Sequence, residues 1–451
     1  MPRRNLIILL ATGVMTIFCY HKAESIGRTQ YGRMFSNFAQ VMDEIEQNYV
    51  RKVDRQDLFD TAMQGMVSSL DDHSDYFSAK ELEALGESLN RRFIGIGIRV
   101  STDPDTKLLM VSTPMVGSPG HKAGLAAGDL ILAINGVSTL DKTSSECSDL
   151  IRGEEGTVVT LTVRHYGTDE AVEIDVERAD IPIPSVEGDR YLPSGMWDFR
   201  LEQEPQIAYI RMNAFVNETL NGLSQALTEL RNKNIKGVIL DVRDNPGGRL
   251  EVAVDMCNLF LNSGVIVSTK GRDGIREIYE ASDTGTEPSY PMAILVNGES
   301  ASASEILAAA LQDHRRAIVV GQRTYGKGSV QSVMDLVNGD AALKLTIAEY
   351  RRPSGENIHR HEGDEEDHDW GVRPNPGYEV PLTLEEWVRL KIQRQRRDVF
   401  DPTGRMSTAP NDQNGGPIRA PDQTILDPQL QRAIKAIYDQ IRNRAGRTEP
   451  A

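Results

Sequence analysis

The sequence predicts a multidomain α+β protein in which a helical N-terminal region precedes a β-rich module and an α/β core. Apolar residues with helical spacing between residues 30 and 90 indicate the helical region. Short β-rich runs separated by turn signals indicate the module, and alternating strands and helices from about 205 to 350 indicate the core. The length of 451 residues leaves room for about three domains.

The composition is that of a globular protein with few cysteines. With 39% hydrophobic residues the chain can bury a sizeable core, and a formal net charge of −16 argues against a general nucleic-acid-binding protein. Three cysteines are too few for a disulfide framework. We expect Cys147 and Cys257 to be buried free thiols, since they can pair only if the fold brings them together.

The N-terminus has the pattern of an export signal. Arg3 and Arg4 precede an apolar run over residues 6–20, which is short for a membrane span of about 20 residues. Because the small residues of a cleavage site are poorly represented near its end, we expect a signal anchor over residues 1–23, with a cleaved signal peptide as the alternative. The rest of the chain is then expected in the cell envelope, on the periplasmic or extracytoplasmic side of the cytoplasmic membrane.

Two apolar stripes predict the helices of the first region. The stripes consist of Phe35, Phe38, Met42, Ile45 and Tyr49, and of Leu58, Ala62, Met66 and Leu70. Turn-forming residues at 69–74 end the second helix. His73 lies there beside two aspartates, and a turn or cap explains it better than a metal site.

Short runs predict the elements of the module and of the core. In the module we expect strands at 108–111 and 158–163 and a short helix at 144–151. In the core we expect strands at 207–212, 237–242, 292–296, 317–320 and 343–348, and helices at 219–230 and 303–311.

The C-terminal part combines an acidic run, a linker and a last helix. The run at 362–369 follows His361 and contains a second histidine, and we expect a solvated loop, with a metal site as the alternative. Residues 401–424 are rich in Pro, Gly, Asp and Asn and predict a linker. Asp427 and Pro428 suit the N-cap and N1 positions of the last helix. Its apolar face consists of Leu430, Ile434, Ile437 and Ile441.

Residues 321–328 come close to a phosphate-binding loop but do not match it. The pattern G-x-x-x-x-G-K-[ST] requires a hydroxyl side chain after the lysine, and position 328 is glycine. We therefore expect no nucleotide binding.

Ser302 and Lys327 are candidates for nucleophilic catalysis. Ser302 lies between a predicted strand and a predicted helix, where backbone N–H groups are available. Taken alone, this segment is better explained by an ordinary serine N-cap. A serine nucleophile needs a base, and no histidine lies in a sequence context that indicates a catalytic base. Lys327 lies between two glycines, which permit the close packing that a neutral lysine requires, and Gln331 could orient it. An exposed lysine in a glycine loop is the alternative.

The segment from Asp241 to Gly248 could supply oxyanion donors. A predicted strand ends there in Asn-Pro-Gly-Gly, whose free N–H groups can face a developing negative charge. Taken alone, this tetrapeptide is only a turn.

Together the three segments resemble the carboxy-terminal processing proteases, the tail-specific serine peptidases with a PDZ domain in peptidase family S41. Motifs of the types D-x-R-x-N-P-G-G, S-A-S-A-S-E and T-F-G-K-G-S-V-Q recur in that family in this order, and here Tyr325 replaces the usual Phe. The resemblance covers roughly residues 35–380. It implies a core of the crotonase-like or ClpP-like layered type.

The resemblance also implies the roles of individual residues. It assigns the nucleophile to Ser302, the general base to Lys327 and the positioning of that base to Gln331. The oxyanion donors would be the amide of Ala303 and that of Gly247 or Gly248, a choice that the sequence leaves open. No metal or other cofactor is implied.

The β-rich module resembles the PDZ domain of this family. The stretch Phe93–Ile98 looks like its carboxylate-binding loop and first strand, where backbone N–H groups capture a C-terminal carboxylate and the strand edge pairs with a peptide. The residues expected to bind peptide are Gly95, Ile96, Gly97 and Ile98. For the module as a whole, a folding module without a ligand is the alternative. Arg152 is a candidate for gating access to the active site, and an ordinary surface arginine is the alternative for this residue.

These interpretations give a domain layout and a function. The expected parts are an anchor or signal at 1–23, a helical region at 30–90, a PDZ domain at 93–167, a protease core at 180–385 and a linker with helix at 386–451. We expect an exported serine endopeptidase that cleaves polypeptides near apolar C-terminal tails. Its expected partners are tail-bearing polypeptides, the membrane through its anchor, and a second copy or an adaptor protein, but no nucleic acid.

Two alternatives come from other classes of protein. A membrane-tethered PDZ scaffold would bind protein tails without cleaving them, and the intact catalytic candidates weigh against it. A crotonase-like acyl-CoA enzyme would not need Ser302 and Lys327 together, and it would leave the PDZ-like module unexplained.

Overall fold

The computed structural model describes the chain in two units. The residues described are 30–78, 81–82, 92–231, 233–283, 290–336, 341–361, 363–365, 367–400 and 426–445. The first unit comprises residues 1–82 and 331–346, and the second comprises 83–330 and 347–451. The anchor expected at 1–23 and the linker expected at 401–424 lie outside the described residues. Of the helices in the described ranges, none combines the length and the hydropathy that a membrane span requires.

The first unit contains two helices and three paired strands. Its helices are α2 (Gln30–Asn48) and α3 (Arg55–Ser68), and its strands are β1 (Asp75–Ser78), β19 (Ser329–Asp335) and the first half of β20 (Ala341–Arg351). Asp54 caps α3 by accepting hydrogen bonds from the first backbone N–H groups of the helix.

The expectation of helix throughout 30–90 was wrong for residues 75–78. These residues form β1, which pairs antiparallel with residues 341–344 of β20. Tyr76 is buried there opposite Leu343, and such a cross-strand contact outweighs a local helical preference. The turn before the strand was predicted correctly, because the Asp71 carboxylate accepts from the N–H groups of His73 and Ser74, both at 2.8 Å.

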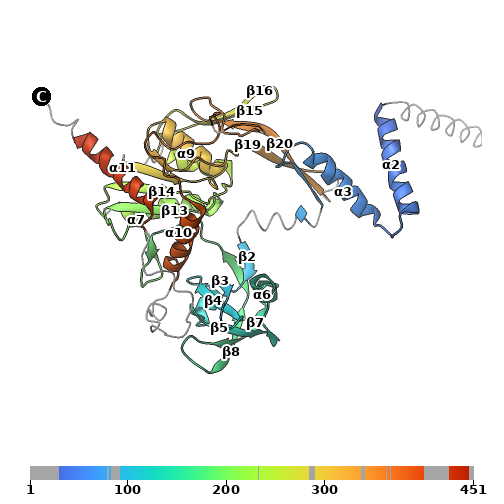
Figure 1. Cartoon of the computed structure of the whole chain (residues 1–451), viewed down its shortest axis with the longest axis horizontal. Helices are drawn as coiled ribbons and strands as arrows, with labels where there is room; N and C mark the ends of the chain where they lie inside the picture. The colour runs from blue at the N-terminus through green and yellow to red at the C-terminus, as the bar shows by residue number, and fades with distance from the viewer. Residues whose placement is uncertain are drawn as a thin grey trace, which may run out of the picture. The chain divides into compact units, whose positions relative to one another are not determined.

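The β-rich module forms a twisted antiparallel sheet with two short helices (Figure 1). Its strand order is β3-β4-β5-β7-β8, with β6 beside β5. The elements are β3 (Ile98–Thr102), β4 (Leu109–Pro114), α5 (Pro119–Lys122), β5 (Leu130–Ile134), β6 (Val137–Ser138), α6 (Ser144–Ile151), β7 (Val158–Arg164) and β8 (Ala171–Glu177). A separate strand pair joins β2 (Arg92–Gly95) to β9 (Ala179–Pro182). The core of the module includes Ile131, Leu161 and Cys147, all fully buried.

The α/β core is built on a sheet with the order β10-β13-β14-β17-β18. Its last four strands run parallel to one another, and the first is antiparallel. The elements are β10 (Val186–Glu187), β13 (Ile207–Met212), α7 (Asn217–Leu230), β14 (Gly237–Asp241), α8 (Leu250–Asn258), β17 (Met292–Val296), α9 (Ala303–Asp313) and β18 (Ile318–Gly321). Further elements are β11 (Arg190–Tyr191), β12 (Trp197–Asp198), β15 (Val265–Gly271), β16 (Gly274–Glu280), α10 (Leu384–Arg397) and α11 (Pro428–Ala445).

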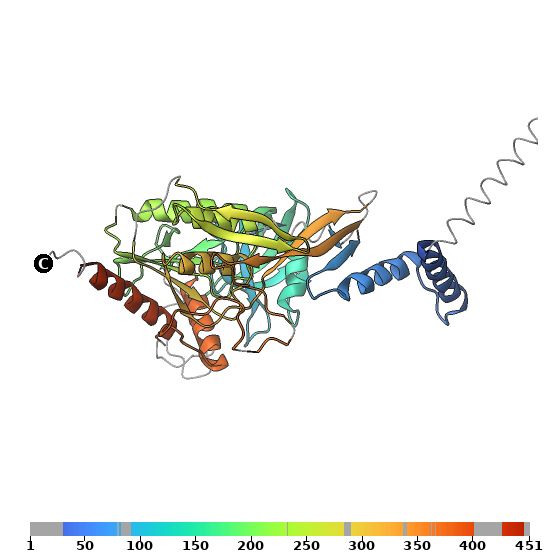
Figure 2. The ribbon, with the colours of Figure 1, turned by 90° about the horizontal axis from the view of Figure 1, so that it is seen from above.

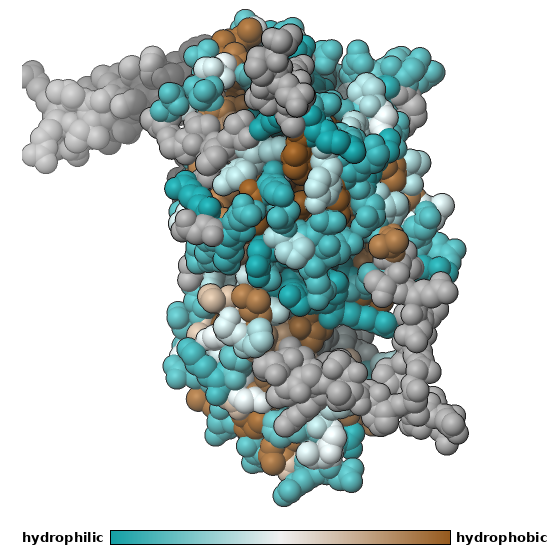
Figure 3. All heavy atoms as spheres, turned by 90° about the vertical axis from the view of Figure 1, so that its left-hand side faces the viewer, coloured by the Kyte–Doolittle hydropathy of each residue, from teal (hydrophilic) through white to brown (hydrophobic). Residues whose placement is uncertain are grey.

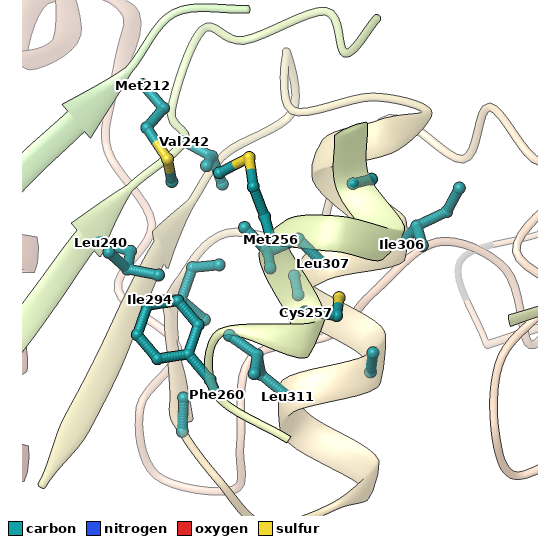
Figure 4. Packing of buried hydrophobic residues seen from close by; sticks show 14 of the residues in the cluster. Met212, Leu240, Val242, Met256, Cys257, Phe260, Ile294, Ile306, Leu307 and Leu311 are labelled. Atoms are coloured by element: carbon teal, nitrogen blue, oxygen red, sulfur yellow. The ribbon is translucent and has the colours of Figure 1, made fainter. Parts of the chain in front are cut away.

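Both faces of this sheet are covered, which explains its uninterrupted apolar strands. Alternate residues of β14 and β17 point to opposite faces, so that Leu240 and Ile294 belong to one core cluster and Ile239 and Leu295 to the other. Figure 4 shows Leu240 and Ile294 facing side chains of α8 and α9 in the first cluster. A parallel sheet buried on both faces needs hydrophobic residues at successive positions, as these strands have.

The last helix covers the second face of the sheet. The Asp427 carboxylate accepts from the backbone N–H groups of Gln429 and Leu430, both at 3.0 Å, which confirms the predicted N-cap. The apolar stripe of α11 packs on β14, β17 and β18 (Figures 1 and 2). Figure 3 shows the face of the molecule on the side of α11, and this face is mainly hydrophilic. The helix therefore turns its apolar residues inward.

Cys147 and Cys257 are free and buried, as predicted. They belong to the separate cores of the β-rich module and of the α/β core. Burial raises the pKa of the Cys257 thiol, so this residue behaves as a small hydrophobic side chain.

We predict that Ile437→Ala destabilises the protein by about 2–5 kcal/mol, because this fully buried side chain fills the space between α11 and the sheet. The urea midpoint of unfolding measures the change. Ile275→Ala makes the same truncation at a side chain that is 66% exposed, and we expect it to stay within about 0.5 kcal/mol of wild type. Equal effects of the two variants would show that α11 does not pack as described.

Candidate active site

Ser302 is the N-cap residue of α9, directly after the turn that follows β17. Its backbone dihedrals are φ 55° and ψ −115°, which a residue with a side chain adopts only under constraint. Hydrogen bonds to the segment after β14 supply that constraint. The Ala301 N–H donates to the carbonyl of Asn245 at 3.0 Å, and the Ser304 hydroxyl donates to the same carbonyl at 2.9 Å.

The Gly-rich turn after β14 lies against the Ser302 backbone. Gly247 has φ 98°, and a Cβ atom at this position would stand 2.8 Å from the Cβ of Ser302 and 2.9 Å from the amide nitrogen of Ala303. The Asn245 side chain fixes the turn by accepting from the Gly247 N–H at 2.9 Å and donating to the Met212 carbonyl at 2.8 Å. Only a residue without a side chain fits so close to the serine.

The amides of Gly248 and Ala303 have no acceptor within the part of the chain that the structure describes. Gly248 pairs with Phe215, whose N–H donates to the Gly247 carbonyl and whose carbonyl accepts from Arg249. Ala303 opens α9, and the first amides of a helix have no partner within it. These two N–H groups can therefore donate hydrogen bonds to a developing oxyanion, whereas the Gly247 N–H already donates to Asn245.

Lys327 lies in a loop between β18 and β19 and is half-buried. Its flanking glycines pack closely on the segment around 358–371. A Cβ atom at Gly326 would stand 2.8 Å from the Cβ of Arg360, and one at Gly328 would stand 2.3 Å from the amide nitrogen of His359. The Lys327 N–H donates to the Glu305 carboxylate at 2.8 Å, which connects the lysine loop to α9.

Gln331 lies in β19 of the first unit. Its side-chain amide donates to the Thr346 hydroxyl at 3.1 Å, and that hydroxyl lies 3.2 Å from the Asp71 carboxylate. Asp71 also accepts from the Ser74 hydroxyl at 2.8 Å. Hydrogen bonds on its side chain lower the pKa of Asp71 although partial burial raises it. The turn at 71–74 therefore holds the strand that carries Gln331.

Sequence reasoning missed a buried network around Arg243. The guanidinium of Arg243 binds Asp241 at 2.7 Å and reaches the N-terminus of α11, with Asp427 and Gln429 both at 2.9 Å. The Tyr209 hydroxyl donates to Asp241 at 2.6 Å. Burial alone would raise the pKa of Asp241, but Arg243 and these hydrogen bonds lower it by more. The net effect is a lowered pKa, so the carboxylate is charged. An arginine inside the D-x-R-x-N-P-G-G turn was the signal in the sequence.

The β-rich module has a groove of about 110 Å³ beside β2 and β3. Its lining includes Gly95, Ile96, Gly97, Ile98 and Arg152, which are residues expected to bind peptide or to gate access. Gly97 has φ 71° and its carbonyl accepts from the Ser118 hydroxyl at 2.8 Å, so the loop is held in one conformation. Arg152 is exposed and forms an ion pair with Asp149 at 3.4 Å.

No group of metal-ligating side chains occurs within the described ranges. In the acidic run, the Asp364 carboxylate instead accepts from the His361 N–H at 2.7 Å and lies 3.2 Å from the ring of His368. These contacts organise a surface loop.

Comparison with known proteins identifies the class. The model of peptidase family S41 matches residues 206–375, that of a PDZ domain matches 110–165, and that of the activating protease CtpB N-terminal domain matches 19–81. Together with the site, these matches define a serine-type peptidase with a PDZ domain.

Individual relatives agree with these matches. The carboxy-terminal-processing protease of Bartonella bacilliformis is 37% identical over 72% of this chain and 73% of its own length. The carboxy-terminal processing protease CtpA of Bacillus subtilis is 32% identical over 83% and 76%. Among solved structures, a photosystem II D1 C-terminal processing protease is 26% identical and covers 82% of this chain and 95% of its own, with a TM-score of 0.45. The chain belongs to peptidase family S41, the carboxy-terminal processing proteases, and acts on polypeptides.

We predict that Gly248→Ala abolishes proteolysis and destabilises the core by about 1–3 kcal/mol. Gly248 has φ 148°, and a Cβ atom there would stand 2.2 Å from the Phe215 carbonyl oxygen, so the turn beside Ser302 must shift. Casein cleavage and the urea midpoint measure both effects. The control Gly298→Ala lies in the turn before Ser302, where a Cβ atom meets nothing within 4 Å, and we expect it to keep activity and stability. Full activity of Gly248→Ala would contradict the described turn.

Proposed function

We propose that this chain is an exported serine endopeptidase that cleaves polypeptides near apolar C-terminal tails by a Ser/Lys mechanism. The observation that carries the proposal is the close approach of the Gly-rich turn to Ser302, with a Cβ position at Gly247 only 2.8 Å from the Cβ of the serine. This approach supports the proposal, because it brings the turn that contains the Gly248 amide against the start of α9, and acyl transfer requires oxyanion donors near the nucleophile.

In the proposed mechanism, neutral Lys327 takes the proton of the Ser302 hydroxyl as the serine oxygen attacks the peptide carbonyl. The Ala303 amide and the Gly248 amide donate to the oxyanion, and the engagement of the Gly247 N–H by Asn245 favours Gly248 as the second donor. The lysine returns the proton to the leaving amine. Water then attacks the acyl-enzyme with the lysine again as base, and Gln331 is proposed to orient the lysine.

We expect Ser302→Ala and Lys327→Ala to lower casein cleavage by about 10³-fold or more, because each removes one partner of a unit that acts together. The matched control is Lys270→Ala, an exposed lysine in β15 that we expect to leave cleavage unchanged. Cleavage by all variants would indicate a contaminant or a misassigned site. Absence of cleavage by wild type, together with binding of peptide tails, would favour the scaffold alternative.

The activity should also depend on pH in one direction. A lysine acts as a base only when neutral, and its ordinary pKa is about 10.4. If burial lowers that pKa in the enzyme, kcat/KM rises with pH and levels off well below pH 10. Steady-state cleavage of a fluorogenic peptide between pH 6 and 10 measures this profile. A profile that is flat over this range, or activity lost on adding a chelator, would contradict the lysine base.

We further propose that the PDZ domain recognises the free C-terminus of the substrate. The supporting features are the groove beside residues 96–98 and the constrained Gly97 loop, whose N–H groups can donate hydrogen bonds to a carboxylate. A peptide with an apolar tail and a free carboxylate should bind, and the same peptide with an amidated C-terminus should bind at least about tenfold more weakly. Fluorescence anisotropy with Ser302→Ala compares the two peptides without cleavage. Equal binding would contradict carboxylate capture.

Export and membrane anchoring complete the proposal. The support is the arginine pair followed by the apolar run at 6–20. A reporter enzyme that is active only outside the cytoplasm, fused after residue 30, tests export, and salt or alkali extraction of membranes distinguishes an anchor from a cleaved signal. Light scattering of the purified chain tests for a homo-oligomer.

A further inference from the structure

Glu305 is a buried titratable group beside the proposed nucleophile that the mechanism above does not use. It lies in the first turn of α9 and its relative exposure is 0%. A carboxylate removed from water is unfavourable unless polar groups replace the lost hydration. Its surroundings therefore indicate what it does.

Four groups within the described chain donate to this carboxylate. One oxygen accepts from the Ser302 N–H at 2.9 Å and from the Lys327 N–H at 2.8 Å. The other accepts from the Gly326 N–H at 2.7 Å and from the Thr324 hydroxyl. A single side chain thus connects the backbone of the proposed nucleophile to the backbone of the proposed base.

A further segment, which contains Gly371 and Val372, encloses the contacts between Glu305 and the lysine loop. The Thr324 hydroxyl also accepts from the Val372 N–H at 2.7 Å, and a Cβ atom at Gly371 would stand 2.9 Å from that hydroxyl and 3.5 Å from the Glu305 carboxylate. Thr324 is therefore held from both sides and cannot turn away from Glu305 without breaking a second hydrogen bond.

Within the described residues, no charged side chain forms an ion pair with the Glu305 carboxylate, although the elements around it carry several. The lysine loop carries Arg323 and Lys327, and the far end of α9 carries Asp313. The described residues of the enclosing segment 358–372 carry His359, Arg360, His361, Asp364, Glu365, Asp367, His368 and Asp369. The guanidinium groups of Arg323 and Arg360 lie over the Trp370 ring, at 3.3 and 4.3 Å from its centroid. The carboxylate thus depends on its hydrogen bonds.

We propose that Glu305 is a positioning residue, whose ionised carboxylate holds the Ser302 and Lys327 backbones at the separation that proton transfer requires. The inference rests on the proposed Ser/Lys mechanism. A protonated carboxyl group carries no negative charge and uses one of its oxygens as a donor, so it holds the N–H groups of Ser302, Gly326 and Lys327 less tightly than the carboxylate does. Peptidase activity therefore requires two deprotonations, one on the lysine and one on Glu305.

The titration of Glu305 falls within the range in which the enzyme can be assayed. Burial raises its pKa to about 7, although the hydrogen bonds from Thr324, Gly326, Ser302 and Lys327 act in the opposite direction. For wild type, log kcat/KM should therefore rise with a slope of two below about pH 7 and with a slope of one above it, until the lysine is neutral.

The first test is Glu305→Gln in the full-length chain. The Gln amide keeps the size of the side chain but offers an acceptor at only one end, so it cannot satisfy all the donors. We expect kcat to fall by about 10²-fold, as small displacements of catalytic groups do, while KM changes less than about threefold. The slope of two at low pH should become a slope of one. Retention of wild-type kcat, or a wild-type profile with a slope of one throughout, would overturn the inference.

A second pair of variants keeps the inference testable if Glu305→Gln does not fold. Thr324→Val removes the hydroxyl at nearly constant volume, and Thr324→Ser keeps it. Because the hydroxyl stabilises the ionised carboxylate, Thr324→Val should shift the lower limb of the pH profile to higher pH by about one unit, and Thr324→Ser should leave it in place. Equal profiles for the two variants would contradict the positioning role.

These outcomes separate this inference from the proposed function. If Ser302→Ala abolishes cleavage and the Glu305 and Thr324 variants keep the wild-type rate and profile, the mechanism stands and the positioning role fails. If Ser302→Ala cleaves like wild type, the proposed mechanism fails, and the positioning role fails with it.

Discussion

The site depends on hydrogen bonds between the two segments that follow the neighbouring strands β14 and β17. β14 and β17 are adjacent and parallel, so the chains that leave their carboxyl ends start side by side. The Asn245 carbonyl then accepts from both the Ala301 N–H and the Ser304 hydroxyl, and this pair of hydrogen bonds joins the Gly-rich turn to the start of α9. The unusual backbone of Ser302 and the fit of Gly247 follow from that junction, since neither segment can move without the other.

A second layer of contacts extends from this junction to the end of the chain. Arg243 belongs to the turn next to the serine, and its charge is compensated by Asp241 within the turn and by Asp427 in the cap of α11. An arginine buried without these partners would be strongly unfavourable. The helix that covers one face of the sheet thus also supplies a carboxylate that compensates the charge of Arg243 in the turn. The packing of the core is therefore linked to the geometry of the site.

Much of the fold followed from local patterns, and the rest depended on contacts distant in sequence. The strands β13 and β17 were predicted with their observed bounds, because continuous apolar runs between turns are typical of buried parallel strands. The segment 75–78 was missed, because its strand depends on pairing with β20 more than 260 residues away. The motifs indicated Ser302 and Lys327, but the role of Glu305 could not be predicted, since a Glu three residues after a serine reads as an ordinary capping box.

The position of α11 after the site residues in the sequence has a consequence for synthesis. The ribosome makes Ser302, the Gly-rich turn and the lysine loop before it makes the helix that closes the second face of the sheet. Until that helix emerges, an apolar sheet face is open to water and Arg243 lacks the partners that α11 supplies. A chain that lacks α11 therefore contains Ser302 and Lys327 without a finished core, so the site can be completed only after a helix that is synthesised later.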